Sequence, residues 1–488
     1  MSASDLIAVL PELILLVAGC AVVLIEPFLA RTGSDRTVLM AIALTGLAAS
    51  VGISLLLTGE DKLAFANMLA LDHWAIFFKV LFGITGIVTL LMSTEYLEAH
   101  GRHLGEYYAL ILFAIIGLDL MAGARDFILF YVAFELMSIS CYILAAYFRY
   151  RLHSNESALK YFLTGSFASA IMLYGISLAY GQAGSTNYYV IGQTLGSQGA
   201  SSAVLFAVLL IGIGLAFKVS AAPFHMWTPD VYQGAPTPVT GFFSVGPKTA
   251  AFAVLIAAFV LAFPGAAKEW GVFLIVLSIV TMLAGNVFGL VQTNVKRMLA
   301  YSSIAHAGYL LAGLGAMGRS AQIYPGRGVL VYLTAYTFMN LGAFAVLAHL
   351  KAQAPHTFDF SLKQFAGLGR RSPWAAALLS LFLLSLTGIP GTAGFIGKFY
   401  VFGGIVRAEL TWLAIVGVLL SAVAAYYYLR VIVYMYFREP EEELSIRRPI
   451  SGSMAAALTI TAVATIAIGI VPSWLWDAVV KAFAALLS

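Results

Sequence analysis

Four ionisable side chains lie deep inside long apolar segments of this sequence: Glu135, Lys218, Lys248 and Lys398. A charged side chain at the centre of a bilayer costs about 2.5–3.5 kcal/mol on insertion scales. Carboxyl and amine groups can bind and release protons, and a chain that keeps four of them at this cost is expected to move ions with them. Any one of the four could be structural, whereas the set favours a series of proton-transfer positions.

Lys218 and Glu135 form the first candidate pair. A carboxylate that approaches a buried amine stabilises its protonated form, and withdrawal of the carboxylate favours release of the proton. Movement of Glu135 relative to Lys218 would therefore load and unload a proton. Two structural alternatives remain open. Lys218 could extend to a membrane surface, or a protonated Glu135 could join helices through Ser138 or Ser140.

Lys248 and Lys398 lie in two later apolar segments, so the three amines are expected to be stations along a line. His306 and His225 are candidate relays between them, because histidine titrates near neutrality. A lone histidine inside a bundle can equally be a hydrogen-bonded core residue. Four polar side chains could organise water near His306: Tyr301, Ser302, Ser303 and Tyr309.

Two other ionisable residues in apolar segments are assigned structural roles. Lys79 is expected to extend its amine to the membrane surface. Asp119 lies near Arg125 at the end of an apolar segment and is expected to orient that helix end.

The elements that position these residues are transmembrane helices. The chain has 488 residues, 61% of them hydrophobic and only 10% charged, whereas a soluble domain has about 25% charged residues. A membrane span needs roughly 20 apolar residues. This rule predicts fourteen spans, followed by a short amphipathic tail at 475–488: 6–29, 37–58, 72–95, 107–124, 127–147, 158–180, 203–235, 238–263, 271–291, 299–317, 327–350, 374–405, 410–436 and 453–474.

The distribution of Lys and Arg predicts the orientation of these spans. With the N-terminus outside the cytoplasm, sixteen of the 27 Lys and Arg residues fall on the cytoplasmic side, seven fall on the opposite side, and four fall within spans. Cytoplasmic loops carry an excess of positive residues, so we expect both termini to be extracytoplasmic. The N-terminus lacks a basic region and a cleavage site, and the first span is expected to be retained.

Two predicted spans are too long and contain helix-breaking residues near the middle. Pro223 interrupts 203–235, and Gly388 and Pro390 interrupt 374–405. Broken helices at membrane depth are tolerated against protein or a wet cavity, and a matched pair points to inverted repeats around a transport site. We therefore expect an all-α polytopic membrane protein with two inverted five-helix repeats. Its predicted regions are 1–106 (spans 1–3), 107–265 (spans 4–8), 266–437 (spans 9–13) and 438–488 (loop, span 14 and tail).

The sequence gives no indication of a cofactor or metal bound to this chain. It contains no Walker A motif, kinase loop or dinucleotide fingerprint. Cys20 and Cys141 lie far apart without a CxxC motif, and the histidines form no pair suited to haem. The energy source is expected to be an ion gradient or chemistry in other chains, and no nucleic-acid partner is expected.

Four motifs resemble the antiporter-like membrane subunits of respiratory complex I. They are FYVAFELMSISCYIL (130–144), KVSAAPFHMWTPDVYQGAPTPV (218–239), QTNVKRMLAYSSIAHAGYLL (292–311) and GIPGTAGFIGKFYVF (388–402). The motifs stand in the family's order, and the likeness covers spans 4–13.

The resemblance implies proton transfer through a glutamate in the fifth span and ionisable residues in the seventh, eighth and twelfth spans. These positions are Glu135, Lys218, Lys248 and Lys398. Lysine in the twelfth span is typical of the L and N types of subunit, whereas the M type has glutamate there. The long lateral helix and extra spans of the L type have no counterpart here, which leaves the N type.

The resemblance further implies a proton-translocating subunit of NADH:quinone oxidoreductase in the bacterial inner membrane. Protons would pass from the cytoplasm to Lys218 and Lys248 and leave past Lys398, with His306 as a bridge and His225 as a second possible relay. NADH, FMN, iron–sulfur clusters and quinone would be bound by partner subunits. The expected neighbours are the M-type antiporter-like subunit, the small K-type subunit and membrane lipid. Two alternatives remain: a subunit of a multi-chain cation/proton antiporter, and a structural spacer.

Overall fold

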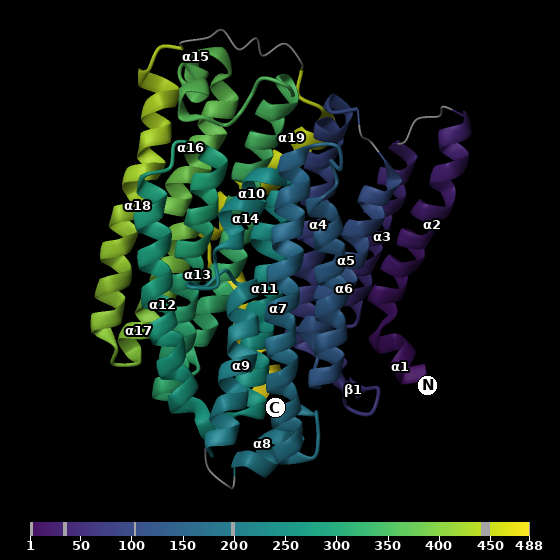
Figure 1. Ribbon diagram of the computed structural model, residues 1–488, viewed down its shortest axis with the longest axis vertical. Coiled ribbons are helices and arrows are strands. Elements are labelled where there is room, and N and C mark those ends of the chain that lie inside the picture. Colours follow the sequence, from purple (N-terminus) through teal and green to yellow (C-terminus); the bar gives the residue numbers. More distant parts are fainter. Residues whose placement is uncertain (1–2, 33–36, 102–103, 197–200, 441–448, 488) are drawn as a thin grey trace.

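The computed structural model describes residues 3–32, 37–101, 104–196, 201–440 and 449–487, which form a bundle of long helices (Figure 1). Within these ranges, eleven helices are long and apolar enough to cross a membrane. Both marked termini, the hairpin and α8 lie at the lower end of the bundle in Figure 1, and α15 lies at the upper end. Four of the sixteen positive residues assigned to the cytoplasm lie outside the described residues: Arg36, Arg102, Arg447 and Arg448.

The elements follow one another along the chain with these bounds: α1 (Ala3–Ala8), α2 (Leu10–Thr32), α3 (Thr37–Leu56), β1 (Lys62–Ala64), β2 (Leu69–Leu71), α4 (His73–Ala99), α5 (Gly105–Gly123), α6 (Phe127–Ala145), α7 (Leu152–Ala183), α8 (Tyr188–Gly196), α9 (Ser202–Lys218), α10 (Trp227–Gly234), α11 (Thr237–Ala262), η1 (Pro264–Ala266), α12 (Ala267–Leu290), α13 (Val295–Ser320), α14 (Tyr324–Gln353), η2 (Leu362–Phe365), α15 (Leu368–Arg371), α16 (Pro373–Thr387), α17 (Ala393–Arg407), α18 (Thr411–Phe437), α19 (Gly452–Ile470) and α20 (Ser473–Leu487).

The core of the bundle is formed by α11 and α14, whose apolar stretches are almost entirely buried, whereas α2, α3, α18 and α19 are largely exposed. Small residues allow close helix contacts around this core, as expected inside a membrane. A side chain at Gly285 of α12 would collide with the backbone of Ala305 on α13.

Both predicted broken segments are interrupted, which confirms this expectation. In the first, α9 ends at Lys218 and α10 begins at Trp227. The Ala222 N–H between them donates to Thr281 Oγ1 at 2.9 Å, so α12 satisfies part of the free backbone. In the second, α16 ends at Thr387 and α17 begins at Ala393.

The second break is built on glycine. Gly388 and Gly391 have φ angles of 97° and 86°, which lie in the left-handed region that glycine adopts most readily. The Gly388 N–H donates to the carbonyls of Leu384 and Ser385 and closes the end of α16. The Ser385 hydroxyl then accepts a hydrogen bond from the Gly394 N–H at 3.0 Å.

The short hairpin of β1 and β2, which the sequence analysis did not predict, covers the lower ends of α4 and α5. Its strands are antiparallel, with Leu63 opposite Ala70. Asp72 follows β2, accepts the Ala75 N–H at 2.7 Å and so caps α4. The same carboxylate contacts the fully buried Arg125 at 2.6 Å. Arg125 is therefore paired with Asp72 and not with Asp119, which lies nearer to it in the sequence.

Asp72→Ala should destabilise the protein strongly. Removing one partner of a buried ion pair costs about 3–5 kcal/mol, because the other charge is left uncompensated. We expect a lower midpoint of thermal denaturation in detergent and less protein in the membrane. The matched control is Glu60→Ala, which breaks an exposed pair with Lys62 and should cost at most about 1 kcal/mol. Equal midpoints for the two variants would contradict the prediction.

The prediction that Lys79 extends its amine to the membrane surface is wrong. Its side chain does not extend to a surface, because the residue is only 2% exposed and its Nζ lies 2.7 Å from Glu12 Oε1. Glu12 itself is 4% exposed. An opposite charge on a neighbouring helix removes the need to reach water.

Candidate proton-transfer site

Lys218 lies at the carboxyl end of α9, where the half-helix stops inside the bundle. It is 1% exposed, and its Nζ donates to Ser138 Oγ at 2.9 Å and to the Tyr161 hydroxyl at 3.1 Å. The amine also lies 5.0 Å from the centroids of the Phe134 and Tyr161 rings. The negative end of the α9 dipole and the ring faces both stabilise a cation here.

Glu135 lies on the same helix as Ser138, one turn away. It is half-buried, and its carboxylate accepts a hydrogen bond from Ser169 of α7. The Ser169 hydroxyl also lies 3.0 Å from the Tyr131 hydroxyl. Among the described residues, no ion pair or hydrogen bond joins Glu135 to Lys218. Glu135 therefore lies on the same helix as Ser138, which contacts Lys218, but Glu135 and Lys218 do not contact each other directly.

Lys248, on α11, is connected to α13. Its Nζ donates to Ser303 Oγ at 2.6 Å and to the Ser303 carbonyl at 3.2 Å, and the residue is 4% exposed. Pro247 lies next to it inside α11, which continues through this residue. Ser303 lies about one turn before His306 on α13, so both residues face the same side of that helix.

His306 lies between two tyrosines from different helices. Its Nδ1 is hydrogen-bonded to the hydroxyl of Tyr332 on α14, and its Nε2 lies 3.1 Å from the hydroxyl of Tyr428 on α18. Tyr428 is also hydrogen-bonded to Ser302. The imidazole is therefore hydrogen-bonded at both nitrogens, which is the arrangement that a proton relay requires.

Lys398, on α17, reaches back across the second break. Its Nζ donates to the carbonyls of Leu386 at 2.9 Å and Thr387 at 2.7 Å, and to Ser421 Oγ at 2.6 Å. These carbonyls end α16, so the amine caps the negative end of a half-helix. Lys218 and Lys398 thus both lie beside a helix break, Lys218 as the last residue of the first half-helix and Lys398 on the second half-helix.

The structure brings Lys248, His306 and Lys398 into one series. Tyr309, one turn after His306, has its ring 5.5 Å from Lys398 Nζ and its hydroxyl 3.3 Å from Asn286. A polar side of α13 therefore runs from Lys248 to Lys398. Tyr301 has a different environment, because its ring packs against Phe288.

Two candidate connections are missing among the described residues. Between Lys218 and Lys248, Tyr161 stacks on Trp227 with ring centroids 4.5 Å apart, and no hydrogen bond joins the two amines' partners. His225 lies in the first break, is 7% exposed, and its Nδ1 has no hydrogen-bond partner within the described ranges. His225 is not brought into contact with the lysines.

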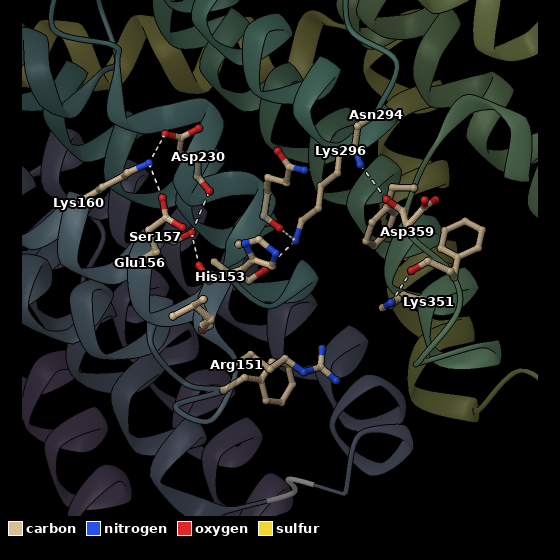
Figure 2. Close-up of a pocket in the computed structure, with 18 of the residues that line it drawn as sticks. Arg151, His153, Glu156, Ser157, Lys160, Asp230, Asn294, Lys296, Lys351 and Asp359 are labelled. Carbon is tan, nitrogen blue, oxygen red and sulfur yellow. Dashed lines mark hydrogen bonds and ion pairs between the residues drawn. The ribbon is translucent and has the colours of Figure 1, made fainter.

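A cavity of about 700 Å³ lies between the start of α7, the α10 segment and the residues that flank α13 and α14 (Figure 2). Its wall includes four cationic and three acidic side chains: Arg151, Lys160, Lys296, Lys351, Glu156, Asp230 and Asp359. Lys296 is 2% exposed and donates to the Ala235 carbonyl at 2.6 Å, just beyond the end of α10. Such a charged wall suits water rather than an apolar ligand.

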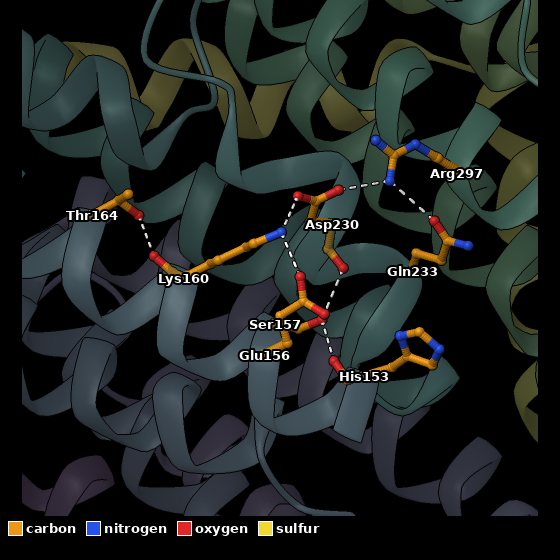
Figure 3. Close-up of polar contacts among 8 residues, drawn as sticks. All are labelled: His153, Glu156, Ser157, Lys160, Thr164, Asp230, Gln233 and Arg297. Carbon is orange, nitrogen blue, oxygen red and sulfur yellow. Dashed lines mark hydrogen bonds and ion pairs between the residues drawn. The ribbon is translucent and has the colours of Figure 1, made fainter. Parts of the chain in front are cut away.

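Asp230 of α10 holds the second half of the broken helix in place beside this cavity (Figure 3). Its carboxylate contacts Lys160 of α7 at 2.9 Å and Arg297 of α13 at 2.7 Å. Lys160 also pairs with Glu156 at 2.8 Å. The network connects α7, which carries Tyr161 beside Lys218, to α10 and to α13, which carries Ser303.

Asp230, Lys296 and Ser421 were not among the site residues predicted from the sequence. Asp230 and Lys296 lie at segment ends, where charged residues are common, and a serine gives no signal of its own. The Pro229-Asp230 pair after the break in span 203–235 was the one local signal available.

The chain is similar to known proteins over most of its length. Residues 124–424 match the family described as NADH:quinone oxidoreductase/Mrp antiporter, TM. A protein of Solibacter usitatus named NADH-quinone oxidoreductase subunit N 1 is 42% identical over 98% of this chain and 97% of its own length. The chain belongs to the subunit N family.

Two solved structures share the fold of this chain. A chain of respiratory complex I from Thermus thermophilus with bound aureothin is 32% identical, covers 96% of this chain and 99% of its own, and superposes with a TM-score of 0.78. A chain of the Mrp complex from Dietzia sp. DQ12-45-1b is 21% identical, covers 99% and 97%, and has a TM-score of 0.84. At this lower identity the likeness concerns the fold alone.

Proposed function

We propose that this chain is a proton-translocating N-type membrane subunit of an NADH:quinone oxidoreductase and carries no redox centre of its own. The observation that carries the proposal is the buried polar side of α13. Ser303 contacts Lys248, His306 follows one turn later between Tyr332 and Tyr428, and the ring of Tyr309 lies 5.5 Å from Lys398 Nζ. The family of the chain supports the reaction, since relatives 42% identical to it bear that name. Quinone reduction in partner subunits would drive the proton transfer.

The proposed route begins at the cavity beside Asp230 and leads to Lys218. The distance between the Glu135 carboxylate and the Lys218 amine would control whether the lysine keeps its proton, because an approaching carboxylate stabilises the protonated amine. The proton would continue to Lys248, along Ser303 and His306, and leave past Lys398. The aromatic contact of Tyr161 with Trp227 is the step where water or a side-chain movement is required. His225, beside this gap, is kept as a possible relay there.

The proposed architecture has fourteen spans with two inverted repeats. The eleven long helices are supplemented by α13 and by the two interrupted spans, α9 with α10 and α16 with α17. Helices α5–α11 and α12–α18 would form the repeats, corresponding to 107–265 and 266–437, with 1–106 and 438–488 outside them. The two interrupted spans, each with a buried lysine beside its break, support this symmetry.

The proposed partners are the other membrane subunits of the complex, with the M-type and K-type subunits as neighbours. NADH, FMN, iron–sulfur clusters and quinone would be bound by partner chains. Among the described residues, no group of three His, Cys, Asp or Glu side chains is arranged to hold a metal. The proposed location is the bacterial inner membrane with both termini outside the cytoplasm.

The driving force separates this function from a cation/proton antiporter. Inverted membrane vesicles containing the complex should take up protons when NADH is added, and uptake should stop with an inhibitor of quinone reduction. A sodium gradient imposed without NADH should have no effect. Uptake that follows the sodium gradient and ignores NADH would replace the proposal with the antiporter.

Labelling of introduced cysteines tests the proposed orientation. In a chain with Cys20 and Cys141 replaced by alanine, Glu156→Cys at the cavity should react with a membrane-impermeant maleimide in inverted vesicles only. Lys62→Cys in the hairpin should react in right-side-out vesicles only. Both side chains are about half exposed. The opposite pattern would reverse the topology and the direction of proton transfer.

A further inference from the structure

A second group of buried ionisable residues lies in the N-terminal helices, away from the proposed route. Glu12 of α2, Lys79 of α4 and Asp119 of α5 are 4%, 2% and 1% exposed. None of them belongs to the series from Glu135 to Lys398, and the proposed function assigns no role to them.

Helix packing places Asp119 beside Lys79. Near the lower end of the bundle, a Cβ atom on Gly123 of α5 would lie 3.7 Å from the Cβ atom of Ala75 on α4. The helices run in opposite directions, so one turn further into the bundle brings Asp119 opposite Lys79.

The buried carboxyl groups of Glu12 and Asp119 outnumber the single amine of Lys79. Lys79 Nζ lies 2.7 Å from Glu12 Oε1 and 3.4 Å from the Ala8 carbonyl. Asp119 Oδ1 is buried and has no hydrogen-bond partner among the described residues. One amine thus accompanies two buried carboxyl groups, and two carboxyl oxygens, Glu12 Oε2 and Asp119 Oδ1, have no partner among the described residues.

The other ionisable groups at this end have partners of their own. Asp5 of α1 accepts the Phe65 N–H at 2.9 Å, and Asp72 pairs with Arg125. Asp126 accepts the Ile128 N–H at 2.8 Å. No cation among these described groups is therefore left to neutralise a second carboxylate. A buried charge without a partner is costly, and such a group binds a proton instead.

We propose that Glu12, Lys79 and Asp119 form a proton-binding site separate from the Glu135–Lys218–Lys248–Lys398 series, with one proton on Asp119 beside the Glu12–Lys79 ion pair. The site is closed at its outer end by apolar residues of α1, the hairpin and α4: Ala8, Ala64, Leu69, Leu71 and Ile76. Exchange of the proton with water requires movement of this cover.

Infrared spectroscopy of the assembled membrane complex at neutral pH tests the site through the carbonyl stretch of protonated carboxyl groups. Asp119→Asn should lose one such carboxyl relative to wild type. Glu12→Gln should also lose one, because Asp119 then ionises against Lys79. Lys79→Met should gain one, because neither carboxyl retains a counter-charge. A merely structural ion pair would not produce this pattern of signs.

The control is Glu156→Gln, which removes an exposed, ionised carboxylate and should leave the carboxyl signal unchanged. Assembly of each variant is checked by its quinone reductase activity. If Lys79→Met fails to assemble, the difference spectra of Asp119→Asn and Glu12→Gln test the proposal. An unchanged signal in Asp119→Asn overturns the proposal. So does a wild-type carboxyl signal that disappears when sodium is added, because the ligand is then a metal cation. This readout does not depend on proton pumping, so it is independent of the proposed route.

Discussion

Lys398→Arg is expected to lower the number of protons taken up per NADH oxidised, although the variant keeps the positive charge. The Lys398 amine caps the end of α16 and contacts Ser421, and a guanidinium can still donate to these oxygens. Arginine does not release its proton in proteins. A positioned proton-transfer group typically contributes a factor of about 10²–10⁴, so transfer through this chain should fall at least about 100-fold.

The measurement is proton uptake by inverted vesicles, normalised to NADH oxidation and to the amount of assembled complex. Residual uptake is expected from other proton-moving subunits. The matched control is Lys268→Arg at an exposed position near the start of α12, which should not change the ratio. A normal ratio in Lys398→Arg would show that this lysine acts only as a fixed charge and helix cap.

His306→Gln should have the second-largest effect. Glutamine can form hydrogen bonds to the hydroxyls of Tyr332 and Tyr428, but it cannot bind a proton near neutral pH. The connection between Lys248 and Lys398 would be interrupted while the packing of α13 is largely kept. We expect transfer through this chain to fall about 100-fold, at the lower limit for a positioned proton-transfer group.

The same vesicle assay applies to His306→Gln, with His356→Gln at an exposed position as the control. Tyr332→Phe and Tyr428→Phe show whether one or both imidazole contacts are needed. Uptake at the wild-type ratio in His306→Gln would make His306 a hydrogen-bonded core residue, which is the alternative that the sequence left open.

The cost of burying charge is a local signal, and for that reason Lys218, Lys248 and Lys398 were predictable. An amine in the middle of an apolar segment is visible without knowledge of the fold. Interruption of two long segments was visible for the same reason, since Pro223 and Gly388 break a helix whatever packs around it.

Partners from distant segments were not predictable. Lys79 was expected at a surface because nothing near it in the sequence could neutralise it, and Glu12 lies on another helix. Asp119 is closer to Arg125 along the chain than Asp72 is. Asp72 nevertheless forms the pair, because it lies between β2 and the start of α4, where it contacts Arg125. His225 and His306 gave equal signals, and only the fold places two tyrosine hydroxyls beside His306.

Helix periodicity alone predicts a polar face on α13. Ser302, His306 and Tyr309 are spaced by four and three residues, which places them on one face of a helix. Ser303 borders the same face. A polar face on a buried helix inside a membrane predicts a line of contacts, and in the structure this line extends from Lys248 to Lys398.

The central claim is that Lys218 carries protons in a redox-driven complex, and one comparison tests it most directly. NADH-driven proton uptake by inverted vesicles is measured for wild type and Lys218→Ala, with quinone reductase activity and assembly followed in the same preparations. The proposed route predicts an assembled complex whose proton uptake per NADH is reduced. An assembled Lys218→Ala complex that takes up the wild-type number of protons per NADH would contradict the claim.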